Sequence, residues 1–417
     1  MIIKHQKFIL VTTGALLLVI GVVAMALVSH EDYFKPLFSS EGCQLAINRD
    51  DAPMIIAYDK NEFVYPEPGE SSFTFSKHES LRLVCPGSRI NLGSELTYTN
   101  ITSATCVSGN FLNINNKTSV QWTQISCASE AKKTAKLTGR TCENNGKEVN
   151  IGFDVNNIFL TVMRICFDPK KQQALYSEAN ITAAVSQGSS AARPSWTQGP
   201  SSIFNIKKVD QYYKIAKQRP TINKLLGLEP TSTKYIQSHS SYYLARGHLT
   251  AKADNFYDAQ QDATFFLINA APQWQTNNDG NWKSVEASVR DYAEANQVNI
   301  QEITGVYGVA TLPHNSTQQE IELYLYNDGK QSFLPVPEFY WKLVYEPISQ
   351  KGLVIIVQNN PYKTNWQPIC EDIADKISWI NWKRNEQKGG FGYVCTVDSF
   401  KKIVSYVPKL TVRGILT

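Results

Sequence analysis

Hydrophobic and polar positions follow different patterns in three parts of this 417-residue chain. In residues 1–28, a basic start is followed by an apolar, uncharged run that extends from residue 8 to residue 28. Such a run is typical of an export signal and does not contribute to a fold. Ala24 and Ala26 offer a cleavage site, whereas the length of the run also suits an uncleaved signal anchor. We expect cleavage and secretion, with membrane contact only if the segment is retained.

The second part contains short apolar segments separated by glycine, proline and asparagine. Examples are SSFTFS at residues 71–76, LRLVC at residues 81–85 and, further along, VNIGFDV at residues 149–155. Short β-branched and aromatic segments between turn residues predict strands. We therefore expect residues 36–148 to form a small β-rich domain.

In the third part, residues 149–417, the patterns predict both strands and helices. Residues 282–295 have helical spacing, with Trp282, Val285, Val289 and Tyr292 on one face. Strands are predicted at residues 264–268, 307–312, 321–326 and 353–358. Helices are predicted in the basic run up to residue 228 and at residues 374–382. Residues 186–201 are expected to form an exposed loop. This mixture indicates an α+β fold.

The eight cysteines are an even number, and none forms the close Cys-x-x-Cys pair that is typical of zinc sites. Disulfides are the better interpretation. Cys370 and Cys395 stand apart and are expected to pair with each other. The first six, from Cys43 to Cys166, would form three bridges in an N-terminal region, with fifteen connectivities open. Four Asn-x-Ser/Thr sequences agree with an exported glycoprotein, at Asn100, Asn116, Asn180 and Asn315.

The net charge of +4 is too small to identify a partner, but its distribution is informative. Residues 201–250 carry eight basic side chains against two acidic ones, with tyrosines between them. Basic side chains bind phosphates and flat rings stack on bases, so this stretch suits a polyanion. A solvated helix face with ordinary surface lysines is the alternative.

Residues 245–286 collect side chains suited to metal-assisted cleavage of a phosphodiester, which needs a base, a cation and a metal. A neutral His248 can take a proton from water, and Arg246 can hold phosphate oxygens. Taken alone, each candidate also has an ordinary structural interpretation. His248 could be a core histidine, Arg246 a partner in a surface salt bridge, Asn278 a turn residue and Glu286 an acid in a first helical turn.

The spacing within this stretch resembles the signature of the DNA/RNA non-specific endonucleases, the ββα-metal nucleases. In that pattern Asp-Arg-Gly-His is followed by an Asn after 21 residues, a second Asn after nine more and a Glu after eight more. His248, Asn269, Asn278 and Glu286 keep all three spacings. The resemblance implies that His248 is the general base and that Asn278 is the direct ligand of Mg²⁺, with Mn²⁺ as the alternative ion. Glu286 would stand beside the water shell of that ion.

The same resemblance implies that Arg246 binds a phosphate oxygen. It leaves Asn269 either as a catalytic hydrogen-bond donor or as a cap for backbone groups. The chain departs from the family at the opening Asp, which is Ala245 here. The string LARGHL is similar to the version in insect secreted nucleases, including those that degrade double-stranded RNA.

The sequence therefore predicts an α+β ββα-metal nuclease domain at residues 149–417, preceded by a disulfide-stapled β-rich domain. We expect an exported, metal-dependent endonuclease with DNA and RNA as substrates, little sequence preference, products with 5′-phosphate ends and no protein partner. The alternatives are a nuclease specialised for double-stranded RNA and, because of Ala245, a catalytically silent relative that binds nucleic acid.

Overall fold

The computed structural model describes residues 42–417 apart from residues 48–49, 94, 98, 116–117 and 189–191. The apolar run at residues 8–28 and the glycosylation sequence at Asn116 lie outside the described residues. No helix among the described residues is long and apolar enough to cross a membrane.

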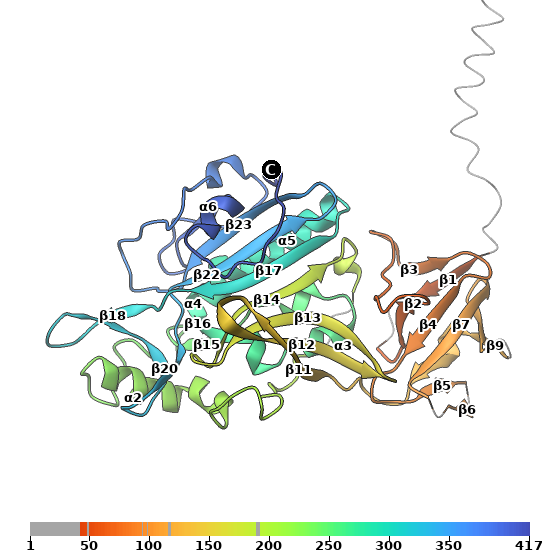
Figure 1. Ribbon diagram of the computed structural model, residues 1–417, viewed down its shortest axis with the longest axis horizontal. Helices are drawn as coiled ribbons and strands as arrows, with labels where there is room; N and C mark the ends of the chain where they lie inside the picture. The colour runs from red at the N-terminus through yellow and green to blue at the C-terminus, as the bar shows by residue number, and fades with distance from the viewer. Residues whose placement is uncertain (1–41, 48–49, 94, 98, 116–117, 189–191) are drawn as a thin grey trace, which may run out of the picture.

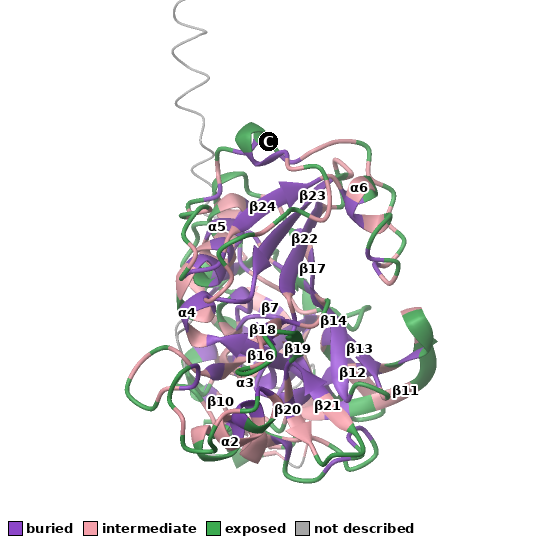
Figure 2. Cartoon of the chain, turned by 90° about the vertical axis from the view of Figure 1, so that its left-hand side faces the viewer, coloured by how far each residue is buried: buried purple, intermediate pink, exposed green. Residues whose placement is uncertain are grey.

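An antiparallel sheet of eight strands forms the centre of the larger part of the molecule (Figure 1). In order across the sheet, the strands are β11 (Thr134–Cys142), β12 (Gly146–Val155), β13 (Ile158–Asp168), β14 (Gln173–Ile181), β17 (Ile300–Tyr307), β22 (Phe339–Glu346), β23 (Lys351–Gln358) and β24 (Gly392–Cys395). In β22, Tyr340 and Val344 belong to one apolar core, and Trp341 and Leu343 belong to another. Because successive side chains of a strand point to opposite faces, this strand is covered on both sides. It is coloured as buried in Figure 2.

Helix α5 (Lys283–Ala295) covers one face of the sheet, because Val285 and Val289 pack in the same core as Tyr340. The short helix α6 (Val397–Lys401) lies on the other face, where the Phe400 ring is 5.4 Å from the Trp341 ring. The predicted helix at residues 282–295 and the predicted strand at residues 353–358 are thus confirmed as α5 and β23.

The N-terminal strands form a separate group beside the central sheet (Figure 1). One sheet contains β2 (Met54–Ala57), β4 (Ser80–Val84), β7 (Ile101–Ser108), β8 (Phe111–Ile114) and β9 (Thr118–Gln121). A second sheet pairs β1 (Cys43–Ala46) with β3 (Ser72–Phe75). A third sheet contains β5 (Ile90–Leu92), β6 (Glu95–Leu96) and β10 (Ile125–Cys127). This group has its own apolar core. Disulfides Cys43–Cys106 and Cys85–Cys127 cross-link it.

The other two disulfides belong to the central sheet. Cys370–Cys395 forms as expected. Cys142–Cys166, expected in an N-terminal region, instead links the end of β11 to β13 within the eight-stranded sheet. Since β11 pairs with β12, this sheet begins at Thr134. We propose that the two domains meet near residue 130, some way before the expected boundary at residue 149.

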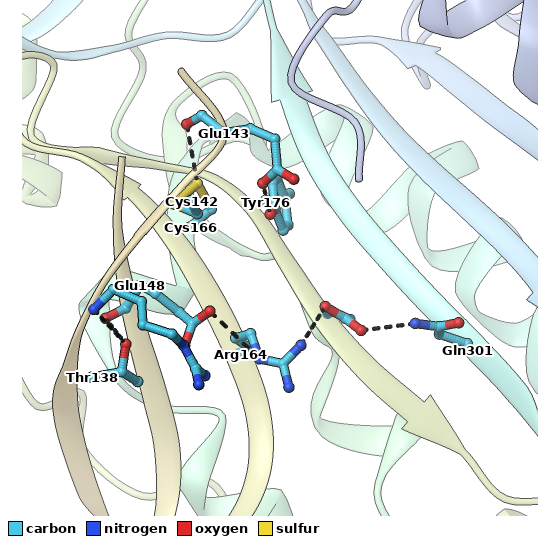
Figure 3. Close-up of polar contacts among 10 residues, drawn as sticks. Thr138, Cys142, Glu143, Glu148, Arg164, Cys166, Tyr176 and Gln301 are labelled. Carbon is cyan, nitrogen blue, oxygen red and sulfur yellow. Dashed lines mark hydrogen bonds and ion pairs between the residues drawn. A yellow bond between two sulfur atoms is a disulfide. The ribbon is translucent and has the colours of Figure 1, made fainter. Parts of the chain in front are cut away.

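Polar side chains also connect the strands at this end of the sheet (Figure 3). Arg164 Nη1 on β13 is 3.1 Å from Glu178 Oε2 on β14, and Gln301 Nε2 on β17 donates to Glu178 Oε1 at 2.8 Å. Arg164 is half exposed, so each of these cross-strand contacts contributes less than about 1 kcal/mol. They help to fix the strand register rather than to form a site.

Four predicted elements differ from the structure. The strand expected at residues 321–326 is divided between β19 (Glu320–Glu322) and β20 (Tyr324–Asn327). Residues 264–268 are not a strand: a turn and a short 3-10 helix (Leu267–Asn269) occupy this segment, and β16 (Ala270–Trp274) begins after it. Residues 307–312 are divided, because β17 ends at Tyr307 and Gly308 has a φ of +71°. At residues 374–382 only Ala374–Lys376 forms a 3-10 turn.

The chain between β14 and β17 leaves the sheet and carries all the candidate catalytic residues. It contains α2 (Ile215–Leu225), β15 (Leu244–His248), α3 (Asp258–Ala263), β16 (Ala270–Trp274) and α4 (Gln275–Asn277) before α5. The basic helical run expected before residue 228 is therefore confirmed as α2. Two short hairpins follow β17, β18 (Thr311–Pro313) with β19 (Glu320–Glu322) and β20 (Tyr324–Asn327) with β21 (Ser332–Pro335).

Candidate active site

A hairpin followed by a helix forms the frame of the site. Strands β15 and β16 pair in antiparallel register, with His248 opposite Ala270. Gly247 permits close packing of this hairpin on β22, since a Cβ atom there would lie 2.3 Å from Gln273 Oε1 and 2.6 Å from the Tyr340 hydroxyl. The chain then turns through α4 into α5, which gives a strand–strand–helix unit.

His248, at the end of β15, has an apolar aromatic environment. Its ring centroid is 4.5 Å from that of Trp196 and 4.8 Å from that of Phe265, and its Nε2 atom is buried without a hydrogen-bond partner among the described residues. Burial, together with the positive charges of Arg193 and Lys133, lowers the pKa of His248 from 6.5 to about 3. The imidazole is therefore neutral near physiological pH and has a nitrogen available to accept a proton.

Arg246, two residues earlier on the same face of β15, is already partnered. Its Nη2 atom is 2.5 Å from Asp210 Oδ1, and its guanidinium lies 5.3 Å from the centre of the Tyr213 ring. The Nε atom is buried and has no partner among the described residues. Arg246 thus forms the salt bridge that its ordinary interpretation predicts, yet it keeps one donor free.

Asn269 is fully buried and all of its hydrogen bonds go to the backbone. Its Oδ1 atom accepts from the Thr250 amide at 3.0 Å, and its Nδ2 atom donates to the carbonyl oxygens of Thr250 and Thr264 at 2.9 and 3.0 Å. These bonds fix the segment that directly follows His248. The geometry favours the role of a cap for backbone groups over that of a catalytic donor.

Asn278 begins a π-helical turn (Asn278–Trp282) between α4 and α5. Its Nδ2 atom donates to Gln275 Oε1 at 3.2 Å, and within the described residues nothing donates to its Oδ1 atom. The neighbouring amides of Asn277 and Asn281 are instead bonded to the backbone of residues 358–390. The local structure thus uses these two carboxamides and leaves the oxygen of Asn278 available to a ligand.

Glu286 lies in the first turn of α5, within a group of charged side chains. Its pKa is raised to about 7, mainly by burial and by Asp254, with a smaller increase from Glu302, while Lys342 and Arg290 lower it. Arg290 Nη1 is 2.6 Å from Asp254 Oδ1, and Lys342 Nζ is 2.5 Å from Glu302 Oε1. The Arg290–Asp254 pair holds α5 against the segment that follows His248, because Asp254 lies six residues after His248.

The oxygen atoms of Asn278 and Glu286 fit a hard divalent cation. Neither the Asn278 Oδ1 atom nor the Glu286 carboxylate receives a hydrogen bond within the described part of the chain. A partly buried carboxylate without a donor is stabilised by a nearby cation. The described residues contain no cluster of three or more His, Cys, Asp or Glu side chains that could hold a metal. One carboxamide with several waters would be a coordination typical of Mg²⁺.

Several side chains near the site were not predicted from the sequence. Arg193 and Trp196 come from the loop at residues 186–201, which was expected only to be exposed. Lys342 and Glu302 carried a signal, because each is a single charge in an otherwise apolar strand, FYWKLVY or IQEITGVY. Arg290, four residues after Glu286, could have been placed on the same helix face.

Comparison with known proteins agrees with this geometry. The family model described as DNA/RNA non-specific endonuclease matches residues 141–400. The chain therefore belongs to the DNA/RNA non-specific endonuclease family. Its α+β fold with a strand–strand–helix unit is that of a ββα-metal nuclease.

The chain is similar in sequence to three named proteins. A salivary endonuclease of Lutzomyia longipalpis is 30% identical over 304 residues, which are 73% of this chain and 66% of that protein. Salivary protein Tsal2A of Glossina morsitans morsitans is 25% identical over 88% of this chain and 91% of its own length. The human mitochondrial nuclease EXOG is 22% identical over 42% of this chain and 49% of its own. The chain thus spans slightly less than two thirds of the Lutzomyia protein.

Proposed function

We propose that this chain is an exported, divalent-metal-dependent endonuclease that hydrolyses DNA and RNA with little sequence preference and leaves 5′-phosphate ends. The observation that carries the proposal is His248, a neutral imidazole with a buried, unpartnered Nε2 atom on the strand–strand–helix unit. Such a nitrogen can take the proton from the attacking water. The bond to the 3′ oxygen then breaks as the new bond from water to phosphorus forms, which leaves the phosphate on the 5′ end.

The negative charge that develops on the phosphate requires positive groups. Arg246 supports this role through its free Nε donor, although Asp210 competes for its guanidinium. Arg193 is exposed, has no ion pair among the described residues and lies near enough to affect the pKa of His248. We assign both guanidiniums to substrate phosphate oxygens.

A divalent ion would stabilise the leaving 3′ oxygen when bound. Asn278 would bind it through Oδ1, and Glu286 would accept hydrogen bonds from its waters. We propose Mg²⁺ as the ion, with Mn²⁺ as the alternative. Asn269 would act by holding the backbone after His248.

The exposed charges support the proposed substrate class. On α2 and its flanks, the side chains of Lys207, Lys208, Lys214, Lys217 and Lys224 are exposed. These can bind phosphates of the backbone, which carry no sequence information. The insect relatives are named as salivary proteins, which supports export. The exposed sequons at Asn180 and Asn315 support glycosylation.

The test uses purified residues 36–417 on supercoiled plasmid and on a long RNA duplex, with Mg²⁺ and with excess EDTA. We expect metal-dependent cleavage that His248→Ala reduces by at least about a hundredfold, because general-base catalysis contributes roughly that much. His239→Ala, an exposed histidine, is the matched control and should retain activity. Cleavage by His248→Ala at the wild-type rate would show that His248 is not the general base. A folded wild-type protein that binds but never cleaves would establish the silent relative. Relative rates on the two substrates decide between general and RNA-duplex specificity.

A further inference from the structure

A cavity of about 340 Å³ lies where the N-terminal strands meet helix α3. Met54, Phe73, Val84 and Trp122 line it from the N-terminal side, and Phe256, Tyr257 and Ala259 line it from the nuclease side. None of the candidate catalytic residues borders it. Junctions between domains are common positions for small-molecule sites, and this volume is at the lower end of their range.

The walls of this cavity are flat and apolar. The Phe73 ring stacks on the Tyr257 ring at 6.3 Å and meets the Phe256 ring edge-on at 5.9 Å. The indole nitrogen of Trp122 donates to the Ala46 carbonyl oxygen at 2.9 Å, so its polar group is already bonded. These walls suit a flat apolar body.

The rim has the opposite character, because it carries carboxylates. Asp50, Asp51, Glu130, Asp258 and Asp262 are among the described lining residues, which include no lysine, arginine or histidine. The Oδ1 atom of Asp262 is buried and has no hydrogen-bond partner among the described residues. The nearby Lys133 directs its Nζ atom to the Asp262 carbonyl oxygen, at 2.7 Å.

Electrostatic repulsion among these carboxylates is already present in the protein. Burial raises the pKa of Asp262; among the charges, Lys133 has the largest effect and lowers the pKa, Glu130 and Asp258 raise it, and Lys252 lowers it. A positive group at the rim would relieve this repulsion and would supply a donor to the unpartnered oxygen of Asp262. A polyanion would be repelled, so the cavity is not an extension of the nucleic-acid surface.

We propose that this cavity binds a protonated organic amine with a flat apolar body. The ring system would lie among Phe73, Phe256 and Tyr257, and the ammonium group would reach Asp262 and Glu130. Aromatic faces also attract cations, which adds to the preference for an amine over a neutral or anionic compound. A hydrated metal ion would gain nothing from the apolar walls. The inference does not depend on nuclease activity.

The test is calorimetric titration of purified residues 36–417 with tryptamine. Indole-3-acetate, an anionic compound with the same ring, is titrated as the control. We expect one tryptamine per chain and no measurable binding of indole-3-acetate. Asp262→Asn and Glu130→Gln should each weaken tryptamine binding by about tenfold, since each removes one charge at close range. Glu62→Gln changes an acid of the N-terminal strands that does not line the cavity, and it should leave the affinity for tryptamine unchanged.

The variants keep the size of each side chain, and an unchanged unfolding midpoint would show that they fold. The proposal is overturned if tryptamine fails to bind at millimolar concentration, if both indoles bind equally, or if neither acidic variant changes the affinity. Because no arm of this experiment measures cleavage, its failure and a failure of the proposed nuclease function are distinguishable.

Discussion

The carboxyl group of Glu286 couples the stability of the protein to pH. Its pKa is raised from 4.5 to about 7, first by burial and then by Asp254. Between these values the folded protein keeps a proton that the unfolded chain releases. The stabilising contribution is therefore complete below pH 4.5 and is lost as pH rises through 7. In EDTA, Glu286→Gln should raise the free energy of unfolding by about 1–3 kcal/mol near pH 8 and by almost nothing near pH 4.5.

Urea unfolding at the two pH values checks this prediction. The pKa of His248, lowered from 6.5 to about 3, acts in the opposite sense, because its contribution is lost as pH falls below 6.5. That contribution is common to the wild type and the variant and cancels in their difference. A gain in stability that is equal at both pH values would contradict the assignment to Glu286 ionisation.

Ala245 occupies the position where the family pattern has an Asp. Alternation along β15 puts its side chain on the same side as Gly247, which faces the Tyr340 hydroxyl. The charge of Glu286 in turn affects Tyr340, so an Asp at position 245 would point toward the region of Glu286. We expect Ala245→Asp to lower the metal concentration for half-maximal cleavage by about three- to tenfold, because it adds an oxygen donor and a negative charge. Ala245→Asn is the control without the charge, and equal metal dependence in the two variants would argue against this geometry.

At the scale of elements, the β15–β16 hairpin depends on the three backbone hydrogen bonds of Asn269. Asn269→Ala leaves the buried backbone groups of Thr250 and Thr264 without these partners, and should cost about 2–4 kcal/mol in urea unfolding. Asn296→Ala, at the exposed end of α5, removes one hydrogen bond and should cost under about 1 kcal/mol. If Asn269→Ala were as stable as Asn296→Ala but inactive, the side chain would be catalytic instead.

Elements with a clear period could be predicted from the sequence, and those fixed by tertiary contacts could not. The spacing of Trp282, Val285 and Val289 identified α5, because only a helix brings these side chains to one face. The apolar run at residues 264–268 resembles a strand, but its side chains fill the core from a turn and a 3-10 helix, so apolar content alone was misleading. At residues 374–382, Trp379 bonds the distant Leu416 carbonyl and Trp382 packs beside Gly392, contacts that no local pattern reveals.

The candidate site shows the same division. The fixed spacing from His248 to Glu286 gave the candidate residues, and these lie on one continuous strand–strand–helix segment. The contribution of Arg193 and of the Glu302–Lys342 pair depends on how distant segments pack, and no spacing encodes it. For the same reason, the partner of Arg246 could not be predicted, since Asp210 reaches it from a separate 3-10 turn.

In the whole molecule, the N-terminal strands differ in charge from the rest of the chain. Residues 42–130 contain nine acidic and six basic side chains, whereas residues 131–417 contain 25 acidic and 32 basic ones. A nucleic acid would therefore be attracted to the nuclease part and not to the N-terminal strands. This distribution argues against a substrate-docking role for the N-terminal domain and favours a role in stability or in binding a cation.

Tyr257 connects the N-terminal strands to the rest of the molecule, and its removal should uncouple the two proposed domains. Its hydroxyl donates to the Val64 carbonyl oxygen at 2.6 Å, and its ring stacks on Phe73. Tyr257→Ala creates a cavity at this joint and should cost about 3–5 kcal/mol. Tyr257→Phe keeps the ring and loses the hydrogen bonds of the hydroxyl with the Val64 carbonyl and the Ile55 amide, which should cost about 1–2 kcal/mol. Calorimetry should then show two unfolding transitions for Tyr257→Ala and one for Tyr257→Phe. The control is Tyr58→Ala, which should also show one transition because Tyr58 is 49% exposed. A single, unshifted transition in Tyr257→Ala would mean that other contacts hold the domains together.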